Sequence, residues 1–220
     1  MKRLLLTASA LLFTLGFAEA ASVKIAFTIH SSPSNTFWQA VKKGFDDACS
    51  KVQADCQMIF TQTEGSIEQQ AANMQAAIAG KPDDMTVCMH LCRGNFAGAW
   101  IADGGYEPIA ELLFNAIGVD GYFLEYDSAR AGGFEPLRFL PKGKIAVLGL
   151  VTTKSPAMET KDELKRRIDE ASRYAPLEQL ALSPQCGFSS GIGGNAMTVD
   201  DEIKKLELVV DTARDVWGSS

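Results

Sequence analysis

Short apolar runs alternate with amphipathic stretches in the chain from residue 23 to residue 83. The runs have the length and the β-branched or aromatic content of strands, and the stretches repeat apolar residues at helical spacing. The expected elements are strands at 23–29 and 56–60 and helices at 37–51 and 66–80. Ser34 or Asn35 is expected to cap the first helix. This strand–helix order predicts the start of a parallel sheet in an α/β fold.

The same alternation continues from residue 84, with longer and more charged helical stretches. The expected strands are 85–90, 119–125, 144–151 and 180–183, and the expected helical segments are 105–117, 134–139, 159–173 and 198–217. Thr198 is expected to cap the last helix, whose first turn carries Asp200 and Asp201. The pattern therefore predicts about four further βα units in this part of the chain.

Composition and charge make several classes of protein unlikely. The chain has 220 residues, of which 46% are hydrophobic and 22% charged, and these are ordinary values for a globular protein. Its formal net charge of -6 argues against a nucleic-acid binder, because such proteins usually carry a basic face. The length is short for a closed (βα)8 barrel of about 250 residues. It is also short for a two-lobed binding protein, whose domains usually have about 100–150 residues each.

Residues 1–20 have the three parts of a secretory signal, namely a basic start, an apolar run and a small-residue end. Lys2 and Arg3 form the basic start, and Ala18 and Ala20 occupy the positions that a signal peptidase reads. A membrane anchor is the alternative, but the apolar run is shorter than the roughly 20 residues that span a bilayer. We therefore expect cleavage after Ala20 and a periplasmic or secreted product without a membrane span.

The chain has five cysteines. Cys49 and Cys56 lie close together in the sequence, between the end of the first helix and the start of the second strand, where an oxidising compartment would allow a local disulfide. Cys88, Cys92 and Cys186 would then remain as thiols. If Cys92 is a metal ligand, as the next residues suggest, its oxidation would compete with metal binding.

Polar residues follow the carboxyl ends of the strands expected after residue 84, where parallel α/β folds place their chemistry. They are His90, Cys92, Glu125, Thr152, Thr153, Lys154 and Cys186. Histidine, cysteine and carboxylate groups are good zinc ligands, and thiolates favour a soft or borderline metal. Each residue alone has a structural alternative, such as a buried cysteine, half of an ion pair or a disulfide partner. Together, His90, Cys92, Glu125 and Cys186 are the candidate zinc ligands.

Four separated motifs carry a resemblance to a known family. They are HLCRGN at 90–95, GGYEP at 104–108, FLEYD at 123–127 and LSPQCGF at 182–188. These stretches resemble the cobalamin-independent methionine synthases, and most of all their short, single-barrel relatives, over about residues 83–218. The resemblance implies that a His-x-Cys pair, a Glu and a distant Cys bind the catalytic zinc. By motif these are again His90, Cys92, Glu125 and Cys186.

The resemblance also implies a reaction. In the family, zinc binds homocysteine as the thiolate, which takes a methyl group from a methyltetrahydrofolate to give methionine. The long enzymes have a histidine before Ser-Pro that is thought to donate a proton, and here that place holds Lys154. Lys154 is therefore the candidate catalytic residue, as a proton donor or as a ligand of a substrate carboxylate. A solvated loop lysine is the structural alternative.

Residues 23–83 resemble a different protein family. The strand at Ile25, the sequence NTFW at 35–38 and the sequence AAIAGKPD at 76–83 resemble the opening of periplasmic sugar-binding proteins of ABC transporters. In that family, residues after the first strand contact the sugar, and an aromatic ring stacks on its apolar face. The matching positions are Asn35, Phe37 and Trp38. The alternative is that the two aromatic side chains pack the first helix.

The two resemblances lead to one expected organisation. A signal peptide (1–20) precedes a βαβα fragment of a binding-protein lobe (21–83), which is fused to a partial TIM-barrel-like (βα)4 segment (84–220). The expected function is zinc-dependent methyl transfer from a methylated folate to homocysteine, impaired because half of the barrel is missing. A sugar-binding component of an ABC transporter and a non-functional hybrid are the alternatives. Open strand edges favour pairing with a second copy, as a homodimer, or aggregation.

Overall fold

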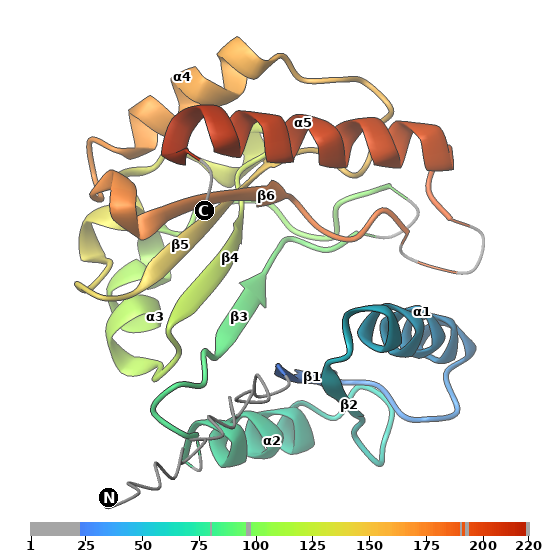
Figure 1. Cartoon of the computed structure of the whole chain (residues 1–220). Helices are drawn as coiled ribbons and strands as arrows, with labels where there is room; N and C mark the ends of the chain where they lie inside the picture. The colour runs from blue at the N-terminus through green and yellow to red at the C-terminus, as the bar shows by residue number, and fades with distance from the viewer. Residues whose placement is uncertain (1–22, 80, 96–97, 190, 192–193, 219–220) are drawn as a thin grey trace, which may run out of the picture.

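The computed structural model describes residues 23–79, 81–95, 98–189, 191 and 194–218 (Figure 1). The expected signal peptide, residues 1–20, lies outside these residues. The described strands form two parallel sheets, a two-stranded sheet of β1 and β2 and a four-stranded sheet in the order β3-β4-β5-β6. The fold is therefore of the α/β type with parallel sheets, as expected. Within the described part of the chain, no helix has the length and hydrophobicity to cross a membrane.

The first unit contains two strand–helix pairs. Its elements are β1 (Lys24–Thr28), α1 (Thr36–Val52), β2 (Asp55–Ile59) and α2 (Ile67–Ala79). Asn35 caps α1, because its Oδ1 accepts hydrogen bonds from the backbone N–H groups of Phe37 and Trp38 at 3.1 and 3.3 Å. Cys49 of α1 and Cys56 of β2 form the local disulfide that the sequence allows.

The first unit buries little apolar surface. Among its described residues, the buried hydrophobic side chains are Ile29, Cys49 and Met58, and α2 has no buried residue. The disulfide therefore lies in a unit that has little hydrophobic core of its own. The described contacts that join this unit to the rest of the chain include one apolar contact and one ion pair. Ile78 packs against the core of the second sheet, and Lys81, just after α2, forms an ion pair with Asp120.

The second part contains the four-stranded sheet and its helices. The strands are β3 (Cys88–Leu91), β4 (Gly121–Glu125), β5 (Ile145–Val151) and β6 (Leu180–Pro184), and the α-helices are α3 (Ala110–Ala116), α4 (Lys161–Ala171) and α5 (Val199–Trp217). Short 3-10 helices span Glu107–Ile109, Ala129–Ala131, Glu135–Phe139 and Leu177–Gln179. Each strand pairs in parallel with the next along the chain. In Figure 1, α4 and α5 lie side by side over β5 and β6.

The helices all pack on one face of this sheet. Alternate strand residues such as Leu124 and Leu148 join Phe114 of α3 and Ile168 of α4 in a single buried cluster. The intervening residues point to the opposite face, where Phe123 is 37% exposed. One face of the sheet is thus the core of the molecule, and the other face is more exposed at positions such as Phe123.

Several element boundaries differ from the expected ones. β3 begins at Cys88 and not at Met85, because the Met85 N–H bonds to Pro82 O in a turn and the Val87 N–H bonds to the Asp120 carboxylate. The helix expected at 105–117 is a 3-10 turn followed by α3, and the segment at 134–139 is a 3-10 helix. The expected Thr198 cap of α5 is confirmed as a reciprocal capping box with Asp201.

Candidate metal centre

The carboxyl ends of the four parallel strands bring the predicted site residues to one edge of the sheet. His90 lies in β3, and Cys92 follows that strand by one residue. Glu125 is the last residue of β4, Lys154 follows β5, and Cys186 follows β6. β3 and β6 are the two outer strands of the sheet, so His90 and Cys92 approach Cys186 across its whole width.

Three of the four candidate zinc ligands come together. One ligand atom each of His90, Cys92 and Cys186 lies within 4.8 Å of the other two, and Cys186 Sγ is 3.5 Å from His90 Nε2. His90 and Cys92 are exposed, and Cys186 is half-buried. Two thiols and an imidazole at this spacing form a donor set that suits zinc.

The contact between the two sulfur atoms shifts their pKa values in opposite directions. The hydrogen bond from the Cys186 thiol, and then that from His90, lower the pKa of Cys92 well below its usual value. The same hydrogen bond to Cys92, together with burial, raises the pKa of Cys186. The contact between the two sulfur atoms therefore favours the thiolate form at Cys92, which is the form that binds a metal, and the protonated form at Cys186.

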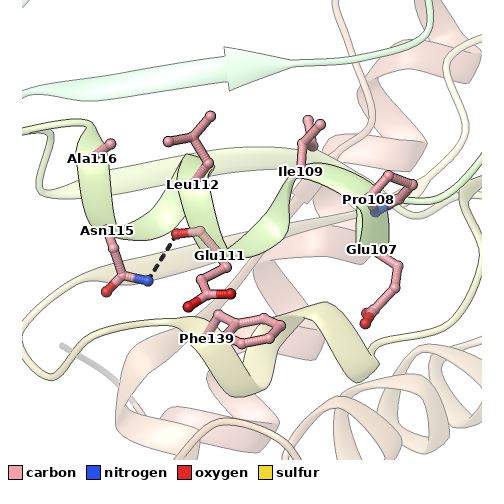
Figure 2. Close-up of a pocket in the computed structure, with 8 residues that line it drawn as sticks. All are labelled: Glu107, Pro108, Ile109, Glu111, Leu112, Asn115, Ala116 and Phe139. Carbon is pink, nitrogen blue, oxygen red and sulfur yellow. Dashed lines mark hydrogen bonds between the residues drawn. The ribbon is translucent and has the colours of Figure 1, made fainter.

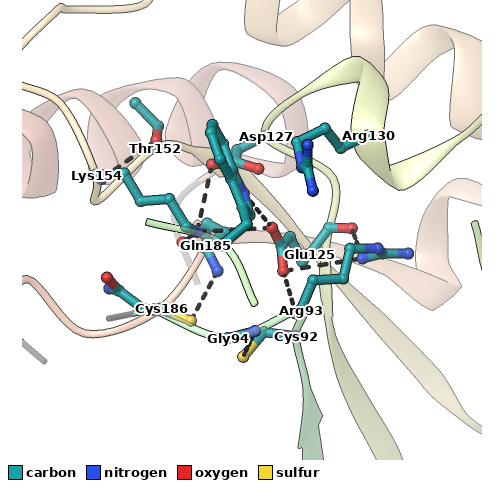
Figure 3. Close-up of polar contacts among 12 residues, drawn as sticks. Cys92, Arg93, Gly94, Glu125, Asp127, Arg130, Thr152, Lys154, Gln185 and Cys186 are labelled. Atoms are coloured by element: carbon teal, nitrogen blue, oxygen red, sulfur yellow. Dashed lines mark hydrogen bonds and ion pairs between the residues drawn. The ribbon is translucent and has the colours of Figure 1, made fainter. Parts of the chain in front are cut away.

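Glu125, the fourth candidate ligand, does not join this group. Its side chain is completely buried, and Oε2 accepts a hydrogen bond from the Arg93 backbone N–H at 2.6 Å. The other oxygen, Oε1, accepts a hydrogen bond from the Trp100 indole N–H at 3.0 Å. Figure 3 shows Glu125 turned toward Arg93, beside the two cysteines. Both of its carboxylate oxygens are thus engaged by the loop that follows β3.

Lys154 lies between the carboxylates and Cys186. Its Nζ donates to Gln185 Oε1 at 2.5 Å and lies 3.6 Å from Glu125 Oε1 and 4.0 Å from Asp127 Oδ2. Gln185 in turn donates its Nε2–H to Cys186 Sγ at 2.7 Å, as Figure 3 shows. Because the Lys154 side chain is only 3% exposed, the alternative of a solvated loop lysine is wrong.

The segment that carries Lys154 is fixed by contacts to α5. The Thr152 N–H donates to Glu159 Oε1 at 2.8 Å, and Lys205 of α5 donates to Glu159 Oε2 at 3.0 Å. Lys205 is fully buried. This anchoring fixes the segment after β5 at the edge of the sheet, beside the cysteines.

Three residues of the site were not predicted as functional. Arg93 is buried and bonds to the Tyr106 hydroxyl at 3.2 Å and to Glu125 O at 3.3 Å. Trp100 holds the Glu125 carboxylate, and Gln185 connects Lys154 to Cys186. Arg93 and Gln185 lie within the motifs that carry the family resemblance, which was the available signal. Trp100 lies outside those motifs, and its role depends on how the loop folds back over β4.

The residues of the predicted sugar site have partners within the first unit. Asn35 uses Oδ1 to cap α1 and donates its Nδ2–H to Glu64 at 2.9 Å. The Phe37 and Trp38 rings contact each other with centroids 5.1 Å apart, and Trp38 also contacts Phe27 at 6.2 Å. These contacts favour the alternative in which the aromatic side chains pack the first helix.

A separate hollow lies beside α3 and the 3-10 helix that precedes it. It has a volume of about 720 Å3 and is lined by Glu107, Pro108, Ile109, Glu111, Leu112, Asn115, Ala116 and Phe139 (Figure 2). None of these residues is a predicted site residue, and none is a histidine, cysteine or lysine. The hollow therefore adds nothing to the chemistry of the sheet edge.

The chain is similar to known proteins over much of its length. The sequence model of the cobalamin-independent synthase catalytic domain matches residues 59–215. Two similar relatives are the uncharacterized proteins YxjG and YxjH of Bacillus subtilis (strain 168), which are 53% and 48% identical to the chain over 148 residues. Each alignment covers 67% of this chain and 39% of the relative. The chain thus spans about two fifths of the length of these relatives.

Two solved structures are also similar. A protein from Listeria monocytogenes, solved as a candidate vitamin-B12 independent methionine synthase, matches with a TM-score of 0.53 and 28% identity over 90% of this chain and 65% of its own. A B12-independent methionine synthase from Shewanella sp. W3-18-1, solved in complex with selenomethionine, matches with a TM-score of 0.53 and 19% identity. That match covers 66% of this chain and 42% of the Shewanella chain, and it shows the fold alone. From the extent of the sequence match, the chain belongs to the family of cobalamin-independent synthase catalytic domains.

Proposed function

We propose that this protein binds zinc through His90, Cys92 and Cys186 and transfers a methyl group from a methylated folate to the homocysteine thiolate, giving methionine. The observation that carries the proposal is the convergence of these three side chains from the two outer strands of the sheet. Family membership supports the reaction type. The substrates and the activity remain proposals, because the chain spans only part of the relatives that it matches.

The residues present fit zinc. Two cysteine sulfur atoms and an imidazole match its preference for sulfur and nitrogen donors. When bound, zinc would supply a Lewis acid that keeps a thiol substrate in its nucleophilic thiolate form at neutral pH. In the proposed site, Gln185 orients the Cys186 sulfur through its Nε2–H, and the Gly94 N–H donates to Cys92 Sγ at 3.4 Å.

Glu125 stays a predicted fourth ligand. A metal beside the cysteines would compete for its carboxylate with the Arg93 and Trp100 N–H groups that hold it. Lys154 stays the predicted catalytic residue. Its ammonium group lies close to Glu125 and Asp127, and we propose that it balances their negative charge beside the sulfur atoms.

We further propose that residues 84–220 form half of a barrel that is fused to the binding-protein-like fragment at 21–83. Four described strands with helices on one face are half of the eight in a closed (βα)8 barrel, and we therefore expect weak turnover. One uninterrupted genomic read across the codons for residues 70–95 tests the fusion, and two separate genes there would contradict it.

We also propose export to the periplasm or the cell exterior. The pattern of residues 1–20 supports export, and the Cys49–Cys56 disulfide is of the kind that persists in oxidising compartments. Cell fractionation with an antibody against the protein tests this proposal. Recovery of the full-length chain in the cytosol would contradict it.

Metal analysis of the purified protein tests the proposed function. We expect about one zinc per chain in the wild type and in Cys88→Ser, and loss of that zinc in Cys186→Ser. Cys88 is the matched control because it is also a free cysteine of the sheet but stands outside the three-residue group. Methionine formation from homocysteine and methyltetrahydrofolate should depend on the same zinc. Zinc that persists in Cys186→Ser would contradict the proposed site.

A further inference from the structure

Cys92 and Cys186 form a pair of neighbouring free thiols at the carboxyl edge of the four-stranded sheet. Their sulfur atoms lie within 4.8 Å of each other, although the two residues follow opposite outer strands. Cys92 is exposed and Cys186 is half-buried, so small molecules in solvent can reach the pair. Formation of a covalent S–S bond of about 2.05 Å requires the two sulfur atoms to approach each other by a few ångströms at most.

A hydrogen-bond donor lies beside each of the two sulfur atoms. Gln185 Nε2 donates to Cys186 Sγ at 2.7 Å, and the Gly94 N–H donates to Cys92 Sγ at 3.4 Å. His90 Nε2 lies 3.5 Å from Cys186 Sγ. Such donors stabilise a sulfur anion both when it attacks a disulfide and when it leaves one. Partial exposure and polar surroundings of this kind are typical of reactive cysteines, whereas buried structural cysteines are inert.

The third free cysteine lacks these features. Cys88 is at the start of β3, where its register partner is Gly121 at the start of β4. Its side chain lies against Gly121, at the other end of the strand from Cys92. Cys88 therefore serves as an internal control for general thiol reactivity.

We propose that Cys92 and Cys186 are a reversible redox pair that small-molecule disulfides, such as oxidised glutathione, convert to an intramolecular disulfide. One protein thiolate attacks the small disulfide, which forms a mixed disulfide and releases one small thiolate. The second protein thiolate then attacks the mixed disulfide, which forms the Cys92–Cys186 bond and releases the second small thiolate. The two cysteines lose two electrons and two protons in total, and the small disulfide is reduced to two thiols.

This bond would have two consequences for the protein. It would link the segments after β3 and β6 and so join the two outer strands of the sheet. It would also remove both sulfur donors from the three-residue group, so that the oxidised chain has no thiolate to offer a metal there. The redox pair itself does not depend on the proposed methyl transfer, because both thiols are present without a metal.

The test uses the full chain after treatment with a chelator. The protein is incubated with oxidised glutathione and then denatured. Its free thiols are counted by their reaction with a chromogenic disulfide reagent, and its intact mass is measured by mass spectrometry. The wild type should fall from three free thiols to one without adding the mass of glutathione. Cys88→Ser should fall from two thiols to none. Cys186→Ser should form no internal disulfide and should carry glutathione on Cys92.

Two outcomes would overturn the redox pair. One is that the wild type keeps three thiols while a small free thiol is oxidised under the same conditions. The other is that Cys88→Ser blocks the loss of thiols. Circular dichroism of each variant shows whether it is folded, and Cys92→Ser provides a second variant if Cys186→Ser does not fold.

A parallel incubation with one equivalent of zinc separates this proposal from the proposed function. If zinc blocks the oxidation, the metal and the disulfide use the same two sulfur atoms, and both proposals are supported. If the thiols are lost equally with and without zinc, the redox pair stands and the proposed zinc site is contradicted.

Discussion

The two sheets of this molecule have the same parallel strand–helix pattern but are stabilised in different ways. The four-stranded sheet packs α3, α4 and α5 on one face around a continuous buried cluster that includes Phe114, Leu124 and Ile168. Within its described residues, the two-stranded unit buries only three hydrophobic side chains and is joined by the Cys49–Cys56 disulfide. The difference indicates that hydrophobic burial stabilises the sheet that carries the candidate metal site, whereas covalent and polar contacts stabilise the first unit.

The largest expected effect comes from the core of the four-stranded sheet. Leu124→Ala should lower the free energy of unfolding by about 2–5 kcal/mol, because Leu124 is 1% exposed and its removal leaves a cavity. Phe123→Ala is the matched control, since Phe123 is the preceding residue of β4 and points to the more exposed face. It should cost about 1 kcal/mol or less. Urea unfolding measures both, and equal costs would contradict the one-sided core.

Removing the disulfide should affect the first unit selectively. The double variant Cys49→Ser/Cys56→Ser should lose about 2–3 kcal/mol, because the short loop that the bond closes gains freedom when the chain is unfolded. Hydrogen exchange measured by mass spectrometry should show faster exchange in α1 and β2 and unchanged exchange in β4 and β5. If β4 and β5 also exchange faster, the two units unfold together and the comparison fails.

The caps of α1 and α5 allow the two units to be compared, because removing either cap should cost a similar free energy of unfolding. Asn35→Ala removes the cap of α1, and Thr198→Ala removes the cap of α5, each at a cost of about 1 kcal/mol. Because the first unit has few other buried contacts, Asn35→Ala should expose its helix to exchange along its length. Thr198→Ala should fray only the first turn of α5. The reverse ranking in hydrogen exchange would show that α1 is the better supported helix.

The smallest effect depends on pH. Hydrogen bonds from the Ser32 backbone N–H and then from the Ser31 hydroxyl lower the pKa of Glu64 from 4.5 to about 2. The carboxylate therefore stabilises the first unit above about pH 4.5, and this contribution is lost as the pH falls through about 2. Glu64→Gln should destabilise the first unit at pH 7, and its difference from the wild type should vanish near pH 2. Trp38 fluorescence follows this change, and a constant difference would exclude Glu64 as its origin.

Much of this organisation could be predicted from the sequence, because periodicity and caps are local signals. The helix after Thr198, the buried strand at 145–151 and the approach of His90, Cys92 and Cys186 follow from pattern and motif. The partners of Glu125 could not be predicted in this way. They depend on the loop that brings Trp100 over the end of β4 and on the burial of Lys154, which are tertiary contacts between distant segments.

X-ray absorption at the zinc edge of the zinc-loaded protein tests the central claim most directly. The account predicts two sulfur ligands at about 2.3 Å and at least one nitrogen at about 2.0 Å, from Cys92, Cys186 and His90. The spectrum of Cys88→Ser should be the same, and that of Cys186→Ser should lose one sulfur ligand. A spectrum with only oxygen and nitrogen ligands would contradict the account.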